Sequence, residues 1–292
     1  DGRYLLHSRS CMDWSLHILE LGPATAMFGR NGASSIFQGA LSGQFTLLLS
    51  LSPMGSGMVN GKLVDRGHVA WLPPGYEFYA RGPVGAHWLS VSIDQAEVRR
   101  WVDDHGIGLD PRLLGFHCGW IDSGATSRLR SLLERASHPA TEPGRRPGSR
   151  GNASLRAQVL EFSLAVLHSM QPVTRPGRGR PRADGREIVR HALYLAEERL
   201  DQTLRVEDFC RAIGVSGTTL QKAFHEQLGT SLHRYLTLRR LHAIHAMLRE
   251  AESADTVSSL CSRFGIWDFG RFAARYRQIF GHLPSQAARH YH

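Results

Sequence analysis

Cysteine is scarce in this chain, with four residues in 292, and the four are scattered as Cys11, Cys118, Cys210 and Cys261. No CxxC pair occurs, so neither a zinc ribbon nor a disulfide framework is expected. A chain of this kind is predicted to work in a reducing cytoplasm. Its cysteines are expected to pack as small apolar side chains rather than to carry redox chemistry.

Long apolar runs are missing as well. The longest uncharged one covers residues 45–51, far short of the ~20 residues that a membrane span needs. No membrane association is therefore predicted. An excess of acidic residues is also absent, because 35 Lys and Arg face 26 Asp and Glu and give a net charge of +9. An anionic partner such as nucleic acid is plausible.

The first 170 residues are predicted to form a β domain with flanking helices. Apolar alternation recurs between residues 14 and 93, with glycine and proline about every ten residues, as in a sandwich or barrel. The segment GHVAWLPPG at residues 67–75 resembles a strand and turn of cupin-like jelly rolls. Helices are predicted over residues 95–103, 126–136 and 153–170. The last has an apolar stripe that would pack on the barrel or on a second subunit.

The residues of a catalytic or metal site are not found in this β domain. Metal-binding cupins use a His-x-His pair on one strand, and the predicted strands have none. His68 and His87 are nineteen residues apart, without a carboxylate at a matching offset. No acid-base pair, nucleophile triad or phosphate loop stands out. We therefore predict no catalytic residue, no metal and no cofactor, and a protein that is not an enzyme.

A small-molecule pocket inside the barrel remains possible, since small barrels can enclose one ligand. The candidate lining residues are Trp71, Phe78, Tyr79 and Trp88. Ordinary core packing is the alternative for each of them.

Residues 171–184 read QPVTRPGRGRPRAD and are predicted to link domains 1–170 and 185–292. The linker holds four basic residues and one acidic residue. Arg178, Arg180 and Arg182 resemble the core of an AT-hook, whose arginines lie in the minor groove of A·T-rich DNA. A solvated basic tether is the alternative.

Residues 185–292 are predicted to be all helical and to contain a helix-turn-helix unit. A helix over residues 206–213 ends at Gly214, and Ser216 stands where an N-cap belongs. Leu220, Phe224 and Leu228 then recur at i, i+4 and i+8 as a buried stripe. The outward residues of this recognition helix are Ser216, Thr218, Thr219, Gln221, Lys222 and His225. Such a helix offers donors and acceptors to base edges.

The pattern recurs about fifty residues later, at residues 256–281. Cys210 precedes Gly214 by four positions, and Cys261 precedes Gly265 by four. The second recognition helix is predicted to present Gly270, Arg271, Ala274 and Arg275. Between the units, a helix over residues 232–250 would be about 28 Å long. Such a helix is suited to two major-groove faces roughly 34 Å apart. The predicted phosphate contacts are Arg239, Arg240 and Arg277.

Residues 186–291 resemble the DNA-binding domain of the AraC/XylS family of bacterial transcription regulators. The matching features are GVS before Leu220 and Phe224, the Tyr235 to Arg240 segment, and the ending FGHLPS at residues 280–285. Leu232, Ile266 and Ala274 depart from the family pattern, and Ala274, which replaces a usual basic residue, puts direct readout by the second unit in doubt. We therefore expect the first unit to carry more of the sequence reading and the second more of the anchoring.

The resemblance implies a sequence-specific regulator that acts at the nucleoid in the cytoplasm. Its implied partners are double-stranded DNA, a small-molecule effector, a second copy of the chain, and RNA polymerase if it is an activator. The alternative functions are a cupin-like metalloenzyme with an appended DNA-binding tail and an architectural DNA binder without an effector.

Overall fold

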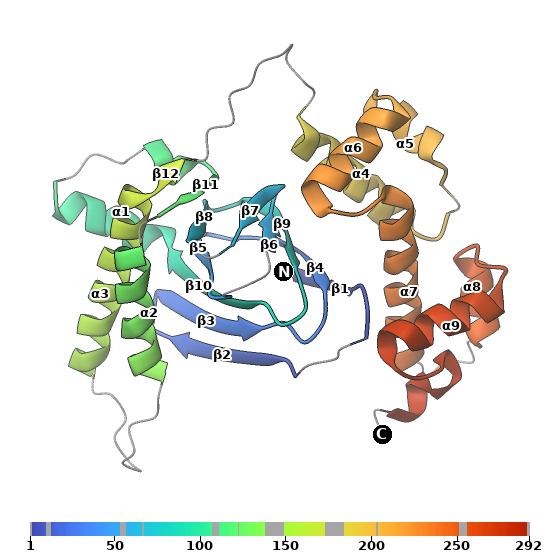
Figure 1. Cartoon of the computed structure of the whole chain (residues 1–292), viewed down its shortest axis with the longest axis horizontal. Coiled ribbons are helices and arrows are strands. Elements are labelled where there is room, and N and C mark those ends of the chain that lie inside the picture. The colour runs from blue at the N-terminus through green and yellow to red at the C-terminus, as the bar shows by residue number, and fades with distance from the viewer. Residues whose placement is uncertain are drawn as a thin grey trace.

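The computed structural model of the chain describes residues 2–9, 13–52, 57–65, 67–106, 111–121, 123–137, 149–172, 184–202, 204–250 and 256–290. Within them a β-rich part carries three helices on one side and faces a purely helical part on the other (Figure 1). The predicted α+β architecture is confirmed. Most of the predicted linker, including Arg178, Arg180 and Arg182, lies outside the described residues.

The described strands form two antiparallel sheets, with the orders β1-β4-β9-β6-β7 and β12-β11-β8-β5-β10-β3-β2. Their bounds are β1 (Gly2–Leu6), β2 (Ser15–Glu20), β3 (Ala24–Arg30), β4 (Ser35–Ala40), β5 (Gln44–Ser50), β6 (Gly57–Val59), β7 (Lys62–Val64), β8 (His68–Leu72), β9 (Glu77–Gly82), β10 (His87–Asp94), β11 (His117–Trp120) and β12 (Gln171–Pro172). Polar turns join most of them, as the glycine and proline spacing predicts.

The larger sheet buries one face under helices α1 (Gln95–Asp104), α2 (Ser123–Ser137) and α3 (Ser149–Ser169). Alternation along β10 sends Leu89, Val91 and Ile93 into this core, while the residues between them face the other sheet. Val159 and Val166 of α3 are fully buried in the same core. The apolar stripe of α3 therefore packs on the barrel, one of its two predicted partners.

The helical part begins at Gly185, where the Asp184 side chain accepts the Arg186 N–H and caps the first helix. Its helices are α4 (Gly185–Glu198), α5 (Val206–Ile213), α6 (Gly217–Leu228), α7 (Leu232–Glu250), α8 (Val257–Arg263) and α9 (Phe269–Phe280). The described residues also include the 3-10 segments η1 (Pro111–Leu114) in the first part and η2 (Pro284–His290) after α9. Among the described residues, no helix combines the length and apolarity that crossing a bilayer requires.

The outer face of the smaller sheet packs directly on the helical part. Leu5, Ile36 and Tyr79 belong to the same buried cluster as the cores of α4 and α6. Polar contacts cross the same seam: the Leu6 N–H donates to His242 Nε2 at 3.0 Å. The Tyr235 hydroxyl donates to Gln38 Oε1 at 3.3 Å. The smaller sheet and the helical part therefore share one buried core.

Acid should weaken this seam. Burial lowers the pKa of His242 to about 4, against an opposing effect of the hydrogen bond to the Leu6 carbonyl and with a further lowering by Arg239. Burial also lowers the pKa of His7 and His245 to about 4. These three pKa values lie below the ordinary histidine value of 6.5. Between pH 4 and 6.5, the form with the barrel packed on the helical part therefore binds fewer protons than the form in which this seam is open. Docking should therefore be intact above pH 6.5 and weaken progressively as the pH falls toward 4.

The amide-exchange protection of Leu6, measured from pH 7 to pH 5, checks this prediction. His242→Asn should reduce its dependence on pH, whereas His191→Asn on the exposed side of α4 should leave that dependence intact. Protection that does not change over this range in the unsubstituted chain would contradict the prediction.

Candidate nucleic-acid interface

The first unit consists of α5 and α6, joined by a sharp turn at Gly214. Gly214 has φ +76° and its N–H donates to the Cys210 carbonyl at 2.9 Å. A left-handed residue here ends α5 without the steric cost that a side chain would bring. The Ser216 hydroxyl then accepts the Thr219 N–H at 3.2 Å and caps α6. The predicted turn and cap are both confirmed.

α6 is anchored on one side and open on the other. Leu220, Phe224 and Leu228 have at most 1% of their surface exposed. The six predicted DNA-facing residues are all exposed: Ser216, Thr218, Thr219, Gln221, Lys222 and His225. Lys222 Nζ lies 3.8 Å from Glu226 Oε1, with both side chains more than half exposed. A surface ion pair of this kind is weak, so it leaves the ammonium available to DNA.

The second unit repeats this construction in α8 and α9. Gly265 has φ +67°, and Asp268 Oδ1 accepts the Arg271 N–H at 2.9 Å as the cap of α9. Of the four predicted outward residues, Gly270, Arg271 and Ala274 are exposed and Arg275 is half-buried. Burial lowers the pKa of Arg275, and the charges of Arg234 and Arg271 lower it further.

The cysteines of the two units hold packing positions. Cys261 is fully buried, and burial raises the pKa of its thiol to about 11. Cys210 is half-buried beside the core of the first unit. A high thiol pKa disfavours the reactive thiolate, in keeping with the predicted structural role.

α7 connects the two units as one continuous helix (Figure 1). Leu232 and Tyr235 belong to the core of the first unit, and Leu241 and Ile244 to that of the second. The helix is therefore buried at both ends against different partners, which fixes the relative orientation of the two recognition helices.

Two of the three predicted phosphate contacts are arginines that bind within the domain. The Arg239 side chain is only 7% exposed, and its Nε and Nη2 atoms donate to the two Glu197 carboxylate oxygens, each at 2.6 Å. Arg240 is half-buried and donates from Nη2 to the Gln202 carbonyl at 2.8 Å. Both guanidinium groups bind within the domain, because α7 is covered on several faces. Arg277 is exposed and remains a candidate.

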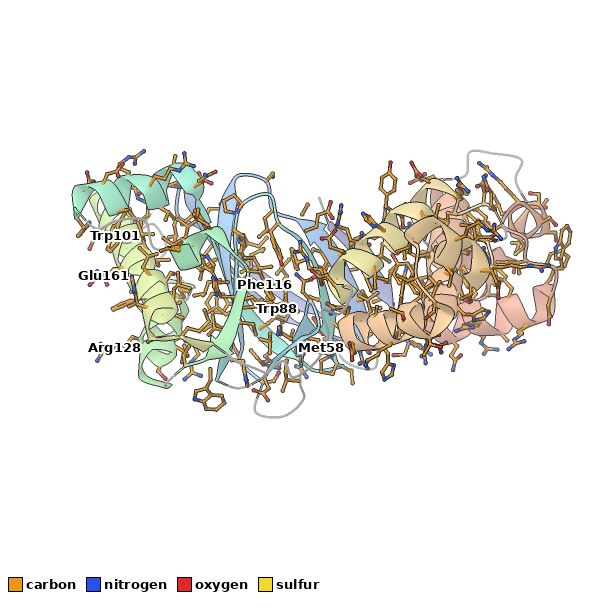
Figure 2. The ribbon with its side chains drawn as sticks, turned by 90° about the horizontal axis from the view of Figure 1, so that it is seen from above. Met58, Trp88, Trp101, Phe116, Arg128 and Glu161 are labelled. Carbon is orange, nitrogen blue, oxygen red and sulfur yellow. The ribbon has the colours of Figure 1, made fainter. Side chains whose placement is uncertain are left out.

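The barrel contains a cavity of about 340 Å³ between the two sheets. Met58 and Trp88, both labelled in Figure 2, line it from opposite sheets together with Phe78. The predictions for Phe78 and Trp88 agree with this placement. The prediction that Trp71 and Tyr79 line the pocket is wrong. Alternation turns Trp71 toward the core under α1–α3 and Tyr79 toward the helical part.

The cavity wall is mostly apolar and has one orphaned polar group. Ser90 is 4% exposed, and its buried hydroxyl has no hydrogen-bond partner. Thr46 and Ser92 satisfy each other at 2.8 Å, and Trp88 Nε1 donates to Asn31 Oδ1 at 3.1 Å. The lining contains no Asp, Glu or Lys among the described residues, and its basic residues are Arg81, whose guanidinium lies against Gly229, and the exposed His87.

A second hollow, of about 800 Å³, lies between the barrel and the second unit. It shares Tyr4, Asn31 and Trp88 with the cavity, so the two spaces adjoin at these side chains. Within the described part of the chain, no three His, Cys, Asp or Glu side chains gather as they would around a metal ion. His68 contacts the Asp65 carboxylate.

The most exposed aromatic side chain of the described residues was not predicted as a site residue. Trp267 lies in the turn before α9 and is 73% exposed. Its position as the extra residue of the second unit was the available signal in the sequence.

Comparison with known proteins agrees with this geometry. A family model described as a helix-turn-helix domain matches residues 209–290. The "Probable thc operon regulatory protein" of Rhodococcus erythropolis is 30% identical over 182 residues, covering 62% of this chain and 54% of that protein. The "XylDLEGF operon transcriptional activator" of Pseudomonas putida is 27% identical over 106 residues, covering 36% of this chain and 33% of that protein.

A solved structure titled as the AraC-like transcriptional activator CuxR has a TM-score of 0.42 at 16% identity, covering 85% of this chain and 87% of its own. The chain spans about half the length of the first curated relative and a third of the second. The matched helix-turn-helix region and these relatives make the C-terminal part of this chain similar to transcription regulators of the AraC/XylS type.

Proposed function

We propose that this chain is a sequence-specific DNA-binding transcription regulator rather than an enzyme. The observation that carries the proposal is the paired construction of α6 and α9, each capped, each buried along one side and each exposed along the other. Phosphate contacts from arginine and lysine would supply affinity, and the recognition helices would supply sequence preference in successive major grooves. Such a protein acts at the chromosome, and so in the cytoplasm.

We assign the direct readout first to α6, because its outer face carries Thr218, Thr219, Gln221, Lys222 and His225. These side chains hold both donors and acceptors, which discrimination among base pairs requires. The outer face of α9 carries Arg271 and Arg275, which suit phosphates and guanine.

Lys222→Ala is expected to weaken binding to a selected operator by ~1–3 kcal/mol if Lys222 reads a base. Specificity at one position should relax at the same time. If Lys222 instead contacts a phosphate, affinity should fall uniformly and the salt slope by about one. Fluorescence anisotropy titrations at several salt concentrations distinguish the two cases.

Arg99→Ala is the control, since Arg99 is an exposed basic residue on α1, which covers the barrel on the side away from the helical part (Figure 1). It should leave affinity and salt slope unchanged. An unchanged affinity and footprint for Lys222→Ala at low and high salt would refute the assignment.

We further propose the division of labour expected from the sequence: residues 1–170 regulate and dimerise, residues 171–184 tether, and residues 185–292 bind DNA. The curated relatives include proteins named as transcriptional activators. Activation would bring RNA polymerase as a partner, and a homodimer would present four recognition helices to one operator.

The barrel cavity is our proposed effector site. Its wall favours a small, uncharged and mostly apolar molecule with a single hydrogen-bonding group, which would satisfy the Ser90 hydroxyl. The adjoining hollow at the domain seam gives such a ligand a route of entry past Tyr4 and Trp88.

Strand β9 couples this site to the DNA-binding helices. Phe78 and Ala80 face the cavity, whereas Tyr79 between them lies in the core shared with α6. Arg81 on the same strand packs against Gly229, the residue that ends α6, so closely that a side chain on Gly229 would collide with it. A ligand that shifts β9 would therefore shift the seat of the first recognition helix.

A further inference from the structure

The turn before the second recognition helix exposes two aromatic side chains. Trp267 is 73% exposed and Phe269 is 42% exposed. No large apolar side chain among the described residues is more exposed than Trp267. Scattered exposed apolar residues are ordinary, but two aromatics in one turn of a DNA-binding unit need a partner.

Local structure places Trp267 immediately before the N-terminus of α9. In the first unit, only Val215 separates the left-handed Gly214 from the cap Ser216. In the second unit, Ile266 and Trp267 separate Gly265 from the cap Asp268. Ile266 is half-buried and its N–H donates to the Cys261 carbonyl at 2.8 Å, so the residue left to project is Trp267.

The leading end of α9 has little capacity for hydrogen-bonded base readout. Its outward residues are Phe269, Gly270, Arg271 and Ala274, without the Thr, Gln and Lys side chains that α6 presents. Its charge is basic, because Arg263, at the end of α8, and Arg271 are both exposed and Asp268 is the one acid in the turn. An apolar tip within a basic rim is complementary to a groove that has anionic walls and carries methyl groups on its floor.

We propose that Trp267 and Phe269 form a subsite for the 5-methyl groups of thymine, so that the second unit recognises A·T pairs by apolar contact. The inference rests on the proposed DNA-binding function. It commits to DNA rather than to a protein partner because the N-terminal residues of a recognition helix are those that meet base edges in the major groove.

Gly270 supports close approach at this end. A Cβ placed on Gly270 would meet only Asp268 Oδ1, at 3.7 Å, so the surface beside Phe269 is open on the protein side. The chain therefore leaves room for the groove floor where the two aromatic rings project.

The test compares thymine with uracil, which lacks only the methyl group. Duplexes are first selected from a random library with the full chain, and each thymine of the enriched duplex is then replaced singly by deoxyuridine. At one or two thymines in the segment bound by the second unit, we expect removal of the methyl group to lower the affinity about fourfold. The estimate takes ~0.8 kcal/mol per buried carbon and ~1.4 kcal/mol per tenfold change in affinity. Trp267→Ala should bind the original duplex more weakly by a similar factor and no longer distinguish uracil there.

Controls separate this subsite from its surroundings. Tyr194→Ala removes a comparably exposed aromatic from α4 and should change neither affinity nor the uracil response. Lys222→Ala should weaken binding but keep the response, because it lies on the other recognition helix. Melting curves establish that each variant is folded.

The outcomes that overturn the inference are distinct. If no duplex is enriched, the proposed function and this subsite both fail. If an enriched duplex binds and Lys222→Ala weakens it, but every uracil replacement is silent, the subsite alone fails. If Trp267→Ala binds every duplex like the unsubstituted chain yet loses transcription with purified RNA polymerase, Trp267 contacts the polymerase and the proposal is wrong.

Discussion

Glu197→Ala should lower the free energy of unfolding by about 3 kcal/mol, the low end of the range for breaking a buried ion pair. Arg239 is 7% exposed, and its Nε and Nη2 atoms both donate to the Glu197 carboxylate, at 2.6 Å each. Removing that carboxylate leaves a guanidinium buried without its counter-charge. The estimate stays at the low end because Glu197 itself is 27% exposed, which gives water some access.

The effect should extend beyond stability. Glu197 lies on α4, Arg239 on α7, and Arg3 of β1 contacts the same carboxylate at 2.8 Å. The Glu197 carboxylate therefore links α7 of the DNA-binding part to β1 of the barrel. We expect Glu197→Ala to loosen α7 and to weaken operator binding along with the loss of stability.

Urea denaturation of three variants checks this account. Arg3→Ala removes a partner that is 44% exposed, so it should cost less than about 1 kcal/mol. The double replacement Glu197→Leu with Arg239→Met removes both charges and should recover much of the loss. Equal, small losses for Glu197→Ala and Arg3→Ala would show that the pair contributes nothing beyond a surface contact.

Ser90→Leu should abolish the response to effector while leaving the fold intact. Its side chain would enter the cavity of about 340 Å³ and occupy the space of the ligand. It also removes a buried hydroxyl without a partner, whose presence costs ~1–3 kcal/mol. Ser90→Ala, which removes the hydroxyl but keeps the space, should therefore stabilise the chain by about 1 kcal/mol. Ser90→Ala should weaken ligand binding without excluding the ligand from the cavity.

Thermal-shift screening of the full chain and its Ser90 variants measures ligand binding in the cavity. An uncharged apolar compound at 100 times its Kd should stabilise the chain by about 2.7 kcal/mol, and Ser90→Leu should show no shift. Ser163→Ala is the matched control, because Ser163 is a fully buried serine on α3 that donates to the Val159 carbonyl at 2.7 Å, away from the cavity. A ligand-induced thermal shift that persists in Ser90→Leu would place the effector site elsewhere. A screen in which every stabilising compound is a carboxylate would contradict the proposed ligand class.

The helix-turn-helix units were predictable because their signals are local. The predicted helices over residues 206–213 and 232–250 coincide with α5 and α7. Gly214 and Ser216 act within a few residues of their own positions, as a left-handed turn and a cap. The exposed face of α6 follows from the 3.6-residue period once the buried stripe is known.

Residue roles that depend on what packs opposite were not predictable in the same way. Arg239 has the type and position of a phosphate contact, but its environment is set by Glu197, forty-two positions away. Trp71 and Tyr79 are aromatic strand residues like Phe78 and Trp88. Only the sheet arrangement shows that the first pair points away from the cavity and the second pair into it.

The sequence by itself determined the class of protein: its period, caps and glycines specify two capped helix pairs, and each of these is a property of a short segment. The tertiary structure decided how the parts are connected. Both sheets of the barrel are covered on their outer faces, one by α1–α3 and the other by the DNA-binding helices, with a cavity between them. A strand's alternation fixes only that its two faces differ. Which face meets a ligand and which meets a recognition helix is settled by long-range packing.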